Sequence, residues 1–304
     1  MRSSTWLART CIRGARLACV ALVYASSWGL REAHAQDVSD VPLTVGPRLD
    51  SGGVLDDFQP FWSIGKPRYF AAATFDVGAI FFRPELNLGW GKPHYAWGGL
   101  ELSPQLSLAG TSTSIGAKMA VPGIMLRGGG RYHVWSNRNL LEPRESYTRE
   151  QTELAVGPGS KYFTLDAEMT FDVNLPVGAL VTVGSLHYVG GVPEPYNVFE
   201  QSLRLIVKPP LVWRSRTAYL FGLGQYDTAR IGGVFEMLGS PARDEVMMRV
   251  GPAFAVALTH HLQATVVAAF PVMTKDALGL ESADFGQVSI SYRWATGDRW
   301  PEFP

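Results

Sequence analysis

The stretch FTLDAEMTFDV, residues 163–173, alternates strictly between apolar and polar side chains. Its odd-numbered positions are Phe, Leu, Ala, Met, Phe and Val, and its even-numbered positions are Thr, Asp, Glu, Thr and Asp. Successive side chains of a β-strand point to opposite faces, so this period of two predicts a strand with one apolar and one polar face. The stretch is about twice as long as the usual strand of a soluble sheet.

The same alternation recurs along the chain, and no sustained helical period occurs between residues 67 and 294. Thirteen strands are expected: 67–76, 79–90, 94–109, 112–121, 123–135, 160–173, 177–189, 200–208, 211–224, 227–238, 244–258, 262–272 and 284–294. Closed single-chain bacterial barrels have an even number of strands. We therefore expect 12, with 112–135 or 200–224 as one bent unit. The alternatives are 10, or 14 if 54–65 adds a strand.

A soluble exported sandwich or barrel would show the same alternation, so two other features decide. Strands that span a membrane need about 9–11 residues, which these runs provide. Aromatic residues also gather at the strand ends, as in the girdles at a membrane interface: Trp90, Tyr95, Trp97, Tyr132, Trp135, Tyr162, Phe163, Tyr188, Tyr219, Phe221, Tyr292 and Trp294. The sequence predicts an all-β fold, an antiparallel transmembrane β-barrel.

The N-terminus has the pattern of an export signal. Four arginines precede the short apolar run 17–30, and Ala33-His34-Ala35 gives the small-x-small pattern of a cleavage site. Residues 1–35 are the expected signal peptide, which makes Gln36 the first mature residue. Both cysteines, Cys11 and Cys19, lie in the signal, so the mature chain has no disulfide.

The rest of the chain divides by composition. Residues 36–66 are broken by Pro, Gly and Asp, which predicts an N-terminal periplasmic segment or plug. The barrel is expected over 67–294, and 295–304 form a C-terminal tail. The mature chain carries 22 basic and 26 acidic residues, so no basic surplus indicates nucleic-acid binding.

These features resemble bacterial outer-membrane β-barrel proteins as a class, over roughly residues 67–294. The resemblance rests on the signal, the alternating strands and the aromatic residue near the end of the last strand. It implies an outer-membrane location, contact with outer-membrane lipid and insertion by the barrel-assembly machinery. The tail departs from the class, because such barrels usually end on the aromatic residue of the last strand and here ten residues follow Trp294.

The connections between strands suggest an orientation. Residues 258–262 form an expected tight turn on the periplasmic side, which places 273–283 outside. Residues 136–159 form the longest break, and long loops usually face outward. The run Gly128-Gly129-Gly130 suits a sharply curved strand or a close approach of two backbones.

Charges of both signs fall on the polar faces of the strands. The expected lumen-lining residues are Arg83, Glu85, Glu101, Arg127, Arg131, Asp166, Glu168, Asp172, Arg204, Arg214, Arg216, Arg230, Arg249 and Arg293. In one interpretation, an acidic arc on 166–172 faces a basic arc on 204–230 across a wet pore and sets its selectivity. In the other, the charges pair into a network that fills a narrow lumen, since buried charges must be partnered.

Signals for catalysis or cofactor binding are weak. Ser185 and His187 lie two apart on one strand face, where Oγ and imidazole can meet. Some outer-membrane enzymes of this class use the order His-x-Ser, the reverse of the order here, and the sequence shows no orienting acid nearby. His260 and His261 face opposite ways, and the glycine run lacks the context of a phosphate-binding loop. We therefore expect no catalytic residues, no metal and no cofactor.

The sequence predicts a barrel without enzyme activity that acts as a passive channel or cavity for small solutes. The first alternative is a structural or adhesive surface barrel that acts through its loops. The second is an outer-membrane lipid hydrolase built on Ser185 and His187. The solute and the oligomeric state are not encoded in any pattern found here.

Overall fold

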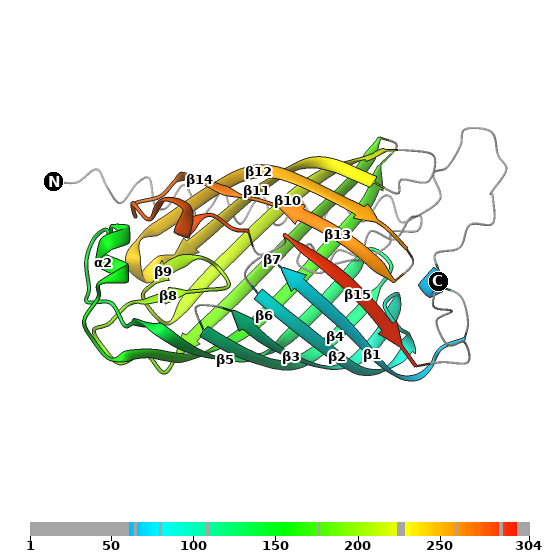
Figure 1. Cartoon of the computed structure of the whole chain (residues 1–304), viewed down its shortest axis with the longest axis horizontal. Coiled ribbons are helices and arrows are strands. Elements are labelled where there is room, and N and C mark those ends of the chain that lie inside the picture. Colours follow the sequence, from blue (N-terminus) through cyan, green and yellow to red (C-terminus); the bar gives the residue numbers. More distant parts are fainter. Residues whose placement is uncertain are drawn as a thin grey trace. The chain divides into compact units, whose positions relative to one another are not determined.

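The computed structural model describes residues 61–63, 66–78, 81–107, 110–175, 177–223, 229–259, 261–285 and 288–296 (Figure 1). The expected signal peptide 1–35, nearly all of segment 36–66 and the tail from 297 onward lie outside the described residues. Within the described residues, no helix is long and apolar enough to cross a membrane.

Twelve antiparallel strands form a closed barrel, as the sequence predicts. Neighbours in the chain pair with one another, and β1 closes the ring by pairing with β15. The strands are β1 (Arg68–Gly78), β2 (Phe81–Lys92), β3 (Ala96–Ser107), β4 (Gly110–Val121), β5 (Ile124–Asn139), β6 (Gly159–Leu175), β7 (Gly178–Gly190), β10 (Leu211–Leu223), β11 (Ala229–Ser240), β12 (Glu245–Ala257), β13 (Leu262–Val267) continued by β14 (Phe270–Met273), and β15 (Ser289–Ala295). Since β13 and β14 both pair with β12, they form one strand of the wall.

One of the thirteen expected strands, 200–208, is not part of the barrel. Two short strands, β8 (Val198–Glu200) and β9 (Leu205–Val207), form a separate hairpin, and all of their residues are buried. A wall strand exposes every second residue to lipid, whereas this hairpin has apolar residues on both faces and is enclosed on both. Segment 200–224 is therefore a buried hairpin followed by the separate wall strand β10, and not one bent strand.

The two ends of the barrel differ. β1 begins and β15 ends at one end, here called the terminal end, which also carries the short turn 258–261. The opposite loop end carries the connections 140–158, 191–210 and 274–288. They include α2 (Arg149–Glu153), the hairpin β8–β9 and the single-turn helix η4 (Gly279–Ser282). With twelve strands, the short turn between β12 and β13 lies at the terminal end, and the connections between β5 and β6 and between β14 and β15 lie together at the opposite end, as the sequence predicts.

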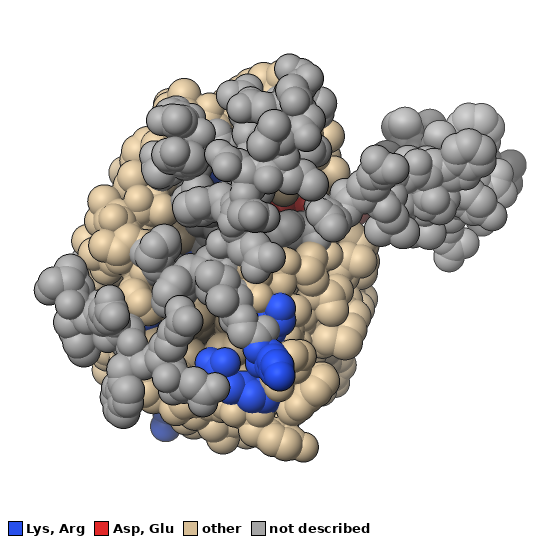
Figure 2. Space-filling model, turned by 90° about the vertical axis from the view of Figure 1, so that its right-hand side faces the viewer, with Lys and Arg blue, Asp and Glu red and all other residues tan. Residues whose placement is uncertain are grey.

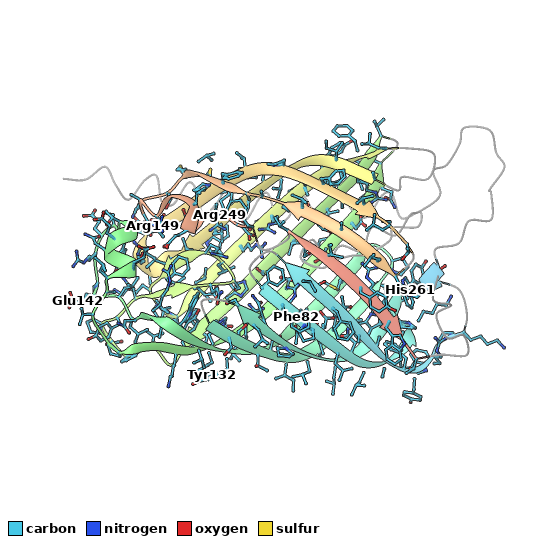
Figure 3. The ribbon with its side chains drawn as sticks, viewed as in Figure 1. Phe82, Tyr132, Glu142, Arg149, Arg249 and His261 are labelled. Atoms are coloured by element: carbon cyan, nitrogen blue, oxygen red, sulfur yellow. The ribbon has the colours of Figure 1, made fainter. Side chains whose placement is uncertain are left out.

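The outer face of the barrel is an apolar band. Leu86, Leu102 and Ile115 lie side by side in the registers of β2, β3 and β4, and all three are exposed. Phe82 and Tyr132 point outward in Figure 3 and are also exposed. An exposed apolar surface of this kind is the lipid-facing surface of a transmembrane barrel.

Three aromatic residues expected in the outer girdles point into the lumen instead. Trp97, Trp135 and Tyr162 are buried on the inner faces of β3, β5 and β6. Trp135 packs against Phe199 of the hairpin with ring centroids 6.2 Å apart. The position of an aromatic residue near a strand end does not predict which face it lies on. Successive residues of a strand face opposite sides, so a difference of one position moves an aromatic ring from the lipid to the lumen.

Glycines permit close approach at two places in the wall. A Cβ at Gly129 would lie 2.5 Å from the Ile115 carbonyl oxygen, and one at Gly116 would lie 2.6 Å from that of Gly128. The glycine run in β5 therefore serves close backbone approach to β4. At Gly251 a Cβ would lie 1.7 Å from the carbonyl oxygen of Ala268, the first residue after β13.

Apolar clusters fill the lumen toward both ends. At the loop end, the hairpin residues Phe199, Leu205 and Ile206 pack with residues of β5, β7, β10, β11 and β12. At the terminal end, Phe70, Trp97 and Met125 pack together, and Trp62 of η2 (Phe61–Ser63) rests on this cluster. Figure 2 looks onto the terminal end and shows Lys and Arg side chains gathered on one part of it.

Candidate functional site in the barrel lumen

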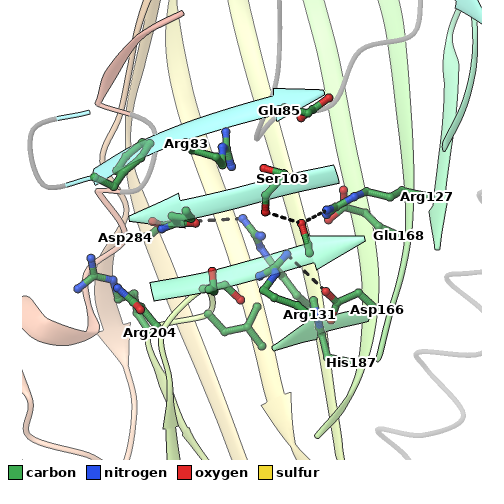
Figure 4. Close-up of a pocket in the computed structure, with 18 of the residues that line it drawn as sticks. Arg83, Glu85, Ser103, Arg127, Arg131, Asp166, Glu168, His187, Arg204 and Asp284 are labelled. Atoms are coloured by element: carbon green, nitrogen blue, oxygen red, sulfur yellow. Dashed lines mark hydrogen bonds and ion pairs between the residues drawn. The ribbon is translucent and has the colours of Figure 1, made fainter. Parts of the chain in front are cut away.

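A polar cavity of about 130 Å³ lies in the lumen, between the hairpin and the barrel wall (Figure 4). Ten of the fourteen expected lumen residues line it: Arg83, Glu85, Glu101, Arg127, Arg131, Asp166, Glu168, Arg204, Arg214 and Arg216. The other four, Asp172, Arg230, Arg249 and Arg293, are buried elsewhere in the barrel. The cavity is large enough to hold several waters.

Glu236 of β11 is the centre of a buried ion network on one side of the cavity. Its Oε1 accepts from Arg214 Nε at 2.6 Å and from Arg216 Nε at 2.9 Å, and its Oε2 accepts from Arg249 Nη1 at 2.8 Å. Arg216 also pairs with Asp284 from the connection 274–288. Because three guanidinium groups share one carboxylate, Asp284 supplies a second negative charge that this part of the lumen needs.

Arg249 ties the hairpin to the wall. Its Nη2 donates to the carbonyl oxygens of Leu203 at 2.7 Å and Arg204 at 2.8 Å, in the turn between β8 and β9. Glu200 holds the same turn from within, since its Oε2 accepts from the backbone N–H of Leu203 at 2.6 Å and from Ser202 Oγ at 2.9 Å. Polar bonds therefore position the hairpin over the cavity.

A second network lies on β2, β3, β4 and β5. Arg127 Nη2 donates to Glu101 Oε1 at 2.6 Å, and Lys118 Nζ lies 3.7 Å from Glu101 Oε2 and 3.5 Å from Glu85 Oε1. The expected charges thus pair along neighbouring strands, as the interpretation of a filled network predicts. The sequence did not indicate the partners, because these depend on register.

The acidic and basic arcs expected to face each other lie on the same wall. Strand β7 alone separates β6, which carries Asp166, from β10, which carries Arg214. Arg204 belongs to the hairpin and not to the wall. Its guanidinium makes no hydrogen bond or ion pair with any described residue, and its backbone has a positive φ of 53°. Arg204 is therefore a cation at the cavity, with the charges of Asp284 and Arg249 near it.

Ser185, His187 and Asp166 form a continuous hydrogen-bonded chain beside the cavity. Ser185 Oγ lies 2.8 Å from His187 Nε2, and His187 Nδ1 lies 2.8 Å from Asp166 Oδ1. The sequence showed the Ser–His pair but not the acid, which the register supplies by placing Asp166 of β6 directly opposite His187 of β7. Alternation alone places Asp166 and His187 on the polar faces of their strands. That they lie opposite each other depends on the register between β6 and β7, which only the structure gives.

Within the described ranges, no group of three or more His, Cys, Asp or Glu side chains could hold a metal ion. His260 lies outside those ranges, and His261 Nδ1 lies 3.1 Å from the carbonyl oxygen of Arg293. His261 therefore serves a backbone contact at the terminal end.

Comparison with known proteins adds no family. No family model matches the sequence, and no curated protein matches it. Among solved structures, the chain is similar to the NanC porin at 9% identity and a TM-score of 0.34, over 75% of this chain and 98% of that one. It is also similar to CdiB from Acinetobacter baumannii, at 9% identity and a TM-score of 0.37, over 78% of this chain and 47% of that one. A third similar structure is the outer membrane protein OmpT of Vibrio cholerae, at 7% identity and a TM-score of 0.29, over 76% of this chain and 99% of that one.

All three TM-scores lie below 0.5, so these likenesses carry no argument of their own. The fold rests on the chain's own architecture, which is that of a transmembrane β-barrel with a closed wall, an apolar outer band and a charged lumen.

Proposed function

We propose that this protein is an outer-membrane channel for small anionic solutes, with the β8–β9 hairpin as a movable plug. The observation that carries the proposal is the cavity of about 130 Å³, lined by charged side chains, between the hairpin and the wall. A barrel whose only task is structural has no need of a hydrated interior. The hairpin is held to the wall by apolar packing and by the two hydrogen bonds of Arg249, and movement of the plug requires these contacts to break.

Arg204 supports an anionic solute. It lines the cavity from the plug, and no described carboxylate pairs with it, whereas the wall arginines Arg127 and Arg214 already hold Glu101 and Glu236. A charge that lines a narrow passage acts on ions at close range. A small anion is therefore attracted to the plug itself.

Single-channel recording in a planar bilayer tests the proposal. We expect wild-type protein to show small, intermittent conductance, and Arg249→Gln to increase the open fraction because the plug loses two bonds to the wall. Arg204→Gln should move the reversal potential in a salt gradient toward cation preference. Lys208→Gln, on the same connection, serves as the matched control, since Lys208 is exposed and does not line the cavity.

A wild-type protein and an Arg249→Gln variant that both fail to conduct at any voltage would contradict the channel. That result would favour the second candidate, a structural or adhesive surface barrel acting through its loops. The observation on its side is that apolar clusters fill both ends of the lumen.

The proposal includes a place in the cell envelope. Export by the signal peptide 1–35, cleavage after Ala35, the envelope of a Gram-negative bacterium and insertion by the barrel-assembly machinery all follow from it. N-terminal sequencing of protein from outer-membrane fractions should begin at Gln36, and a mature chain that still starts at Met1 would contradict the cleavage.

A further inference from the structure

We propose that Ser185, His187 and Asp166 are a catalytic triad that hydrolyses small, water-soluble carboxylic esters inside the barrel. Catalysis by this chain is independent of whether solutes cross the membrane. The inference rests on three side chains from two adjacent strands, joined by two hydrogen bonds of 2.8 Å.

The atoms are joined in the order that nucleophilic catalysis requires. Asp166 is an acceptor when ionised, so its contact fixes the hydrogen of His187 on Nδ1. Nε2 then carries a lone pair and accepts the hydrogen of Ser185 Oγ. This tautomer is the one in which a histidine acts as general base on a serine while a carboxylate orients the ring.

Surrounding residues hold the acid in place and supply positive charge. Arg131 Nη2 lies 3.4 Å from Asp166 Oδ2, which favours the ionised carboxylate. Ser185 has Arg214 of β10 as its direct register partner on one side and Glu168 of β6 on the other. Ser185 therefore lies between register partners of opposite charge, and the guanidinium of Arg214 is itself bonded to Glu236.

The orientation of the triad defines the substrate class. Ser185 and His187 lie on the inner face of β7 and are buried, while Leu186 between them is exposed on the outer face. Membrane lipid therefore does not reach the serine. His187 and Asp166 line the cavity, whose volume of about 130 Å³ is below the roughly 300–1,000 Å³ of pockets for drug-sized ligands. Ser185 is bonded to His187 but does not itself line the cavity, so an ester must reach the serine past His187. A cavity of this size admits a short-chain ester and excludes long acyl chains.

The reaction has two steps with water as the second reactant. Ser185 Oγ attacks the ester carbonyl carbon while its proton moves to His187 Nε2. The C–O bond to the alcohol then breaks, and His187 returns the proton to the leaving alcohol. A water then gives a proton to Nε2 and attacks the acyl carbon. The bond between that carbon and Ser185 Oγ breaks as His187 returns the proton to Oγ, which gives the carboxylic acid and free Ser185.

Turnover of 4-nitrophenyl acetate by detergent-solubilised barrel tests the inference. We expect Ser185→Ala and His187→Gln to lower kcat/KM by at least 100-fold, the usual scale of a general base. Asp166→Asn should lower kcat more than it changes KM. Ser160→Ala is the matched control, because Ser160 is a buried serine on β6 that is not part of the hydrogen-bonded chain of Ser185, His187 and Asp166. The decanoate ester should be cleaved far more slowly than the acetate.

Labelling keeps the test independent of how the variants fold. Diisopropyl fluorophosphate should modify Ser185 of folded protein, as located by peptide mass spectrometry, and Arg249→Gln should accelerate the labelling by loosening the plug. Absence of label on Ser185 in both proteins would overturn the inference. So would turnover in Ser185→Ala equal to that of Ser160→Ala, or faster cleavage of the decanoate.

Discussion

Leu102 and Gln105 of β3 lie on opposite faces of one strand, and a charge at each has opposite consequences. Leu102 is exposed on the outer band, and Gln105 lines the cavity. We expect Leu102→Arg to lower the free energy of unfolding by about 2–4 kcal/mol if the residue lies near the bilayer midplane. Gln105→Arg should cost much less, because the new charge faces water and carboxylates. Urea unfolding in lipid vesicles measures both, and equal costs would mean that the faces are assigned incorrectly.

His94, in the turn between β2 and β3, makes the barrel sensitive to acid. Burial and the charge of Arg293 lower the pKa of His94 from 6.5 to about 3, and its Nε2 contacts the carbonyl oxygen of Trp294 at 3.0 Å. As the pH falls through 6.5 toward 3, the unfolded chain gains a proton that the folded barrel does not, so the folded state loses stability.

The variant His94→Asn should remove this part of the acid sensitivity. Asn also tolerates the positive φ of 56° at this position. Unfolding of both proteins in urea at pH 7 and pH 4.5 makes the comparison. A variant that loses as much stability as wild type on acidification would contradict the assignment to His94.

At the scale of elements, the sequence predicted the wall better than the plug. Alternation identified the wall strands because lipid on one side and water or charge on the other impose a period of two on each of them. The hairpin at 198–207 has no such period, because its apolar residues are enclosed on every side. A run such as Leu205-Ile206-Val207 is compatible with either environment, so its position depends on packing partners that are distant in sequence.

The interruption between β13 and β14 lies against Gly251 of β12. A Cβ at Gly251 would overlap the carbonyl oxygen of Ala268, so the backbone of Gly251→Ala must shift, and we expect a loss of about 1–3 kcal/mol in stability. Gly233→Ala on β11 is the control, because its Cβ would meet its nearest neighbour at an ordinary 3.6 Å. Thermal unfolding should separate the two, and a Gly251→Ala barrel as stable as the control would show that the wall can relax there.

For the whole molecule, the stability of the lumen depends on its charge balance. Glu236→Gln leaves Arg214, Arg216 and Arg249 facing one another with only Asp284 nearby, and breaking a buried pair in this way costs about 3–5 kcal/mol. Arg216→Gln should cost less, since two arginines still neutralise Glu236. Chemical unfolding of both variants tests this order. A reversed order would mean that Glu236 is not the centre of the network.

The sequence indicated which charges face the lumen but not how they combine. Period two assigns a face to each residue, while partners such as Asp166 with His187 or Glu236 with Arg249 depend on register and on strand order around the ring. Asp284 pairs with Arg216 from the connection before β15. The sequence predicted a strand over 284–294, but β15 begins only at Ser289, so the prediction placed Asp284 in the wrong element. The apolar clusters at the two ends of the lumen also form from segments that are distant in the sequence, so the sequence did not predict them.

The ladder between β13 and β15 is short, with four residue pairs against twelve between β11 and β12. Amides held by few neighbouring bonds open in small local units, well below the free energy of global unfolding. We therefore expect deuterium uptake at Gln263 and Ser291, which pair within this short ladder, to run ahead of uptake at Phe235 and Val250 in the long one. The barrel wall is therefore expected to open first between β13 and β15. Hydrogen–deuterium exchange mass spectrometry of the folded protein would show these strands exchanging their amide protons before the rest of the wall.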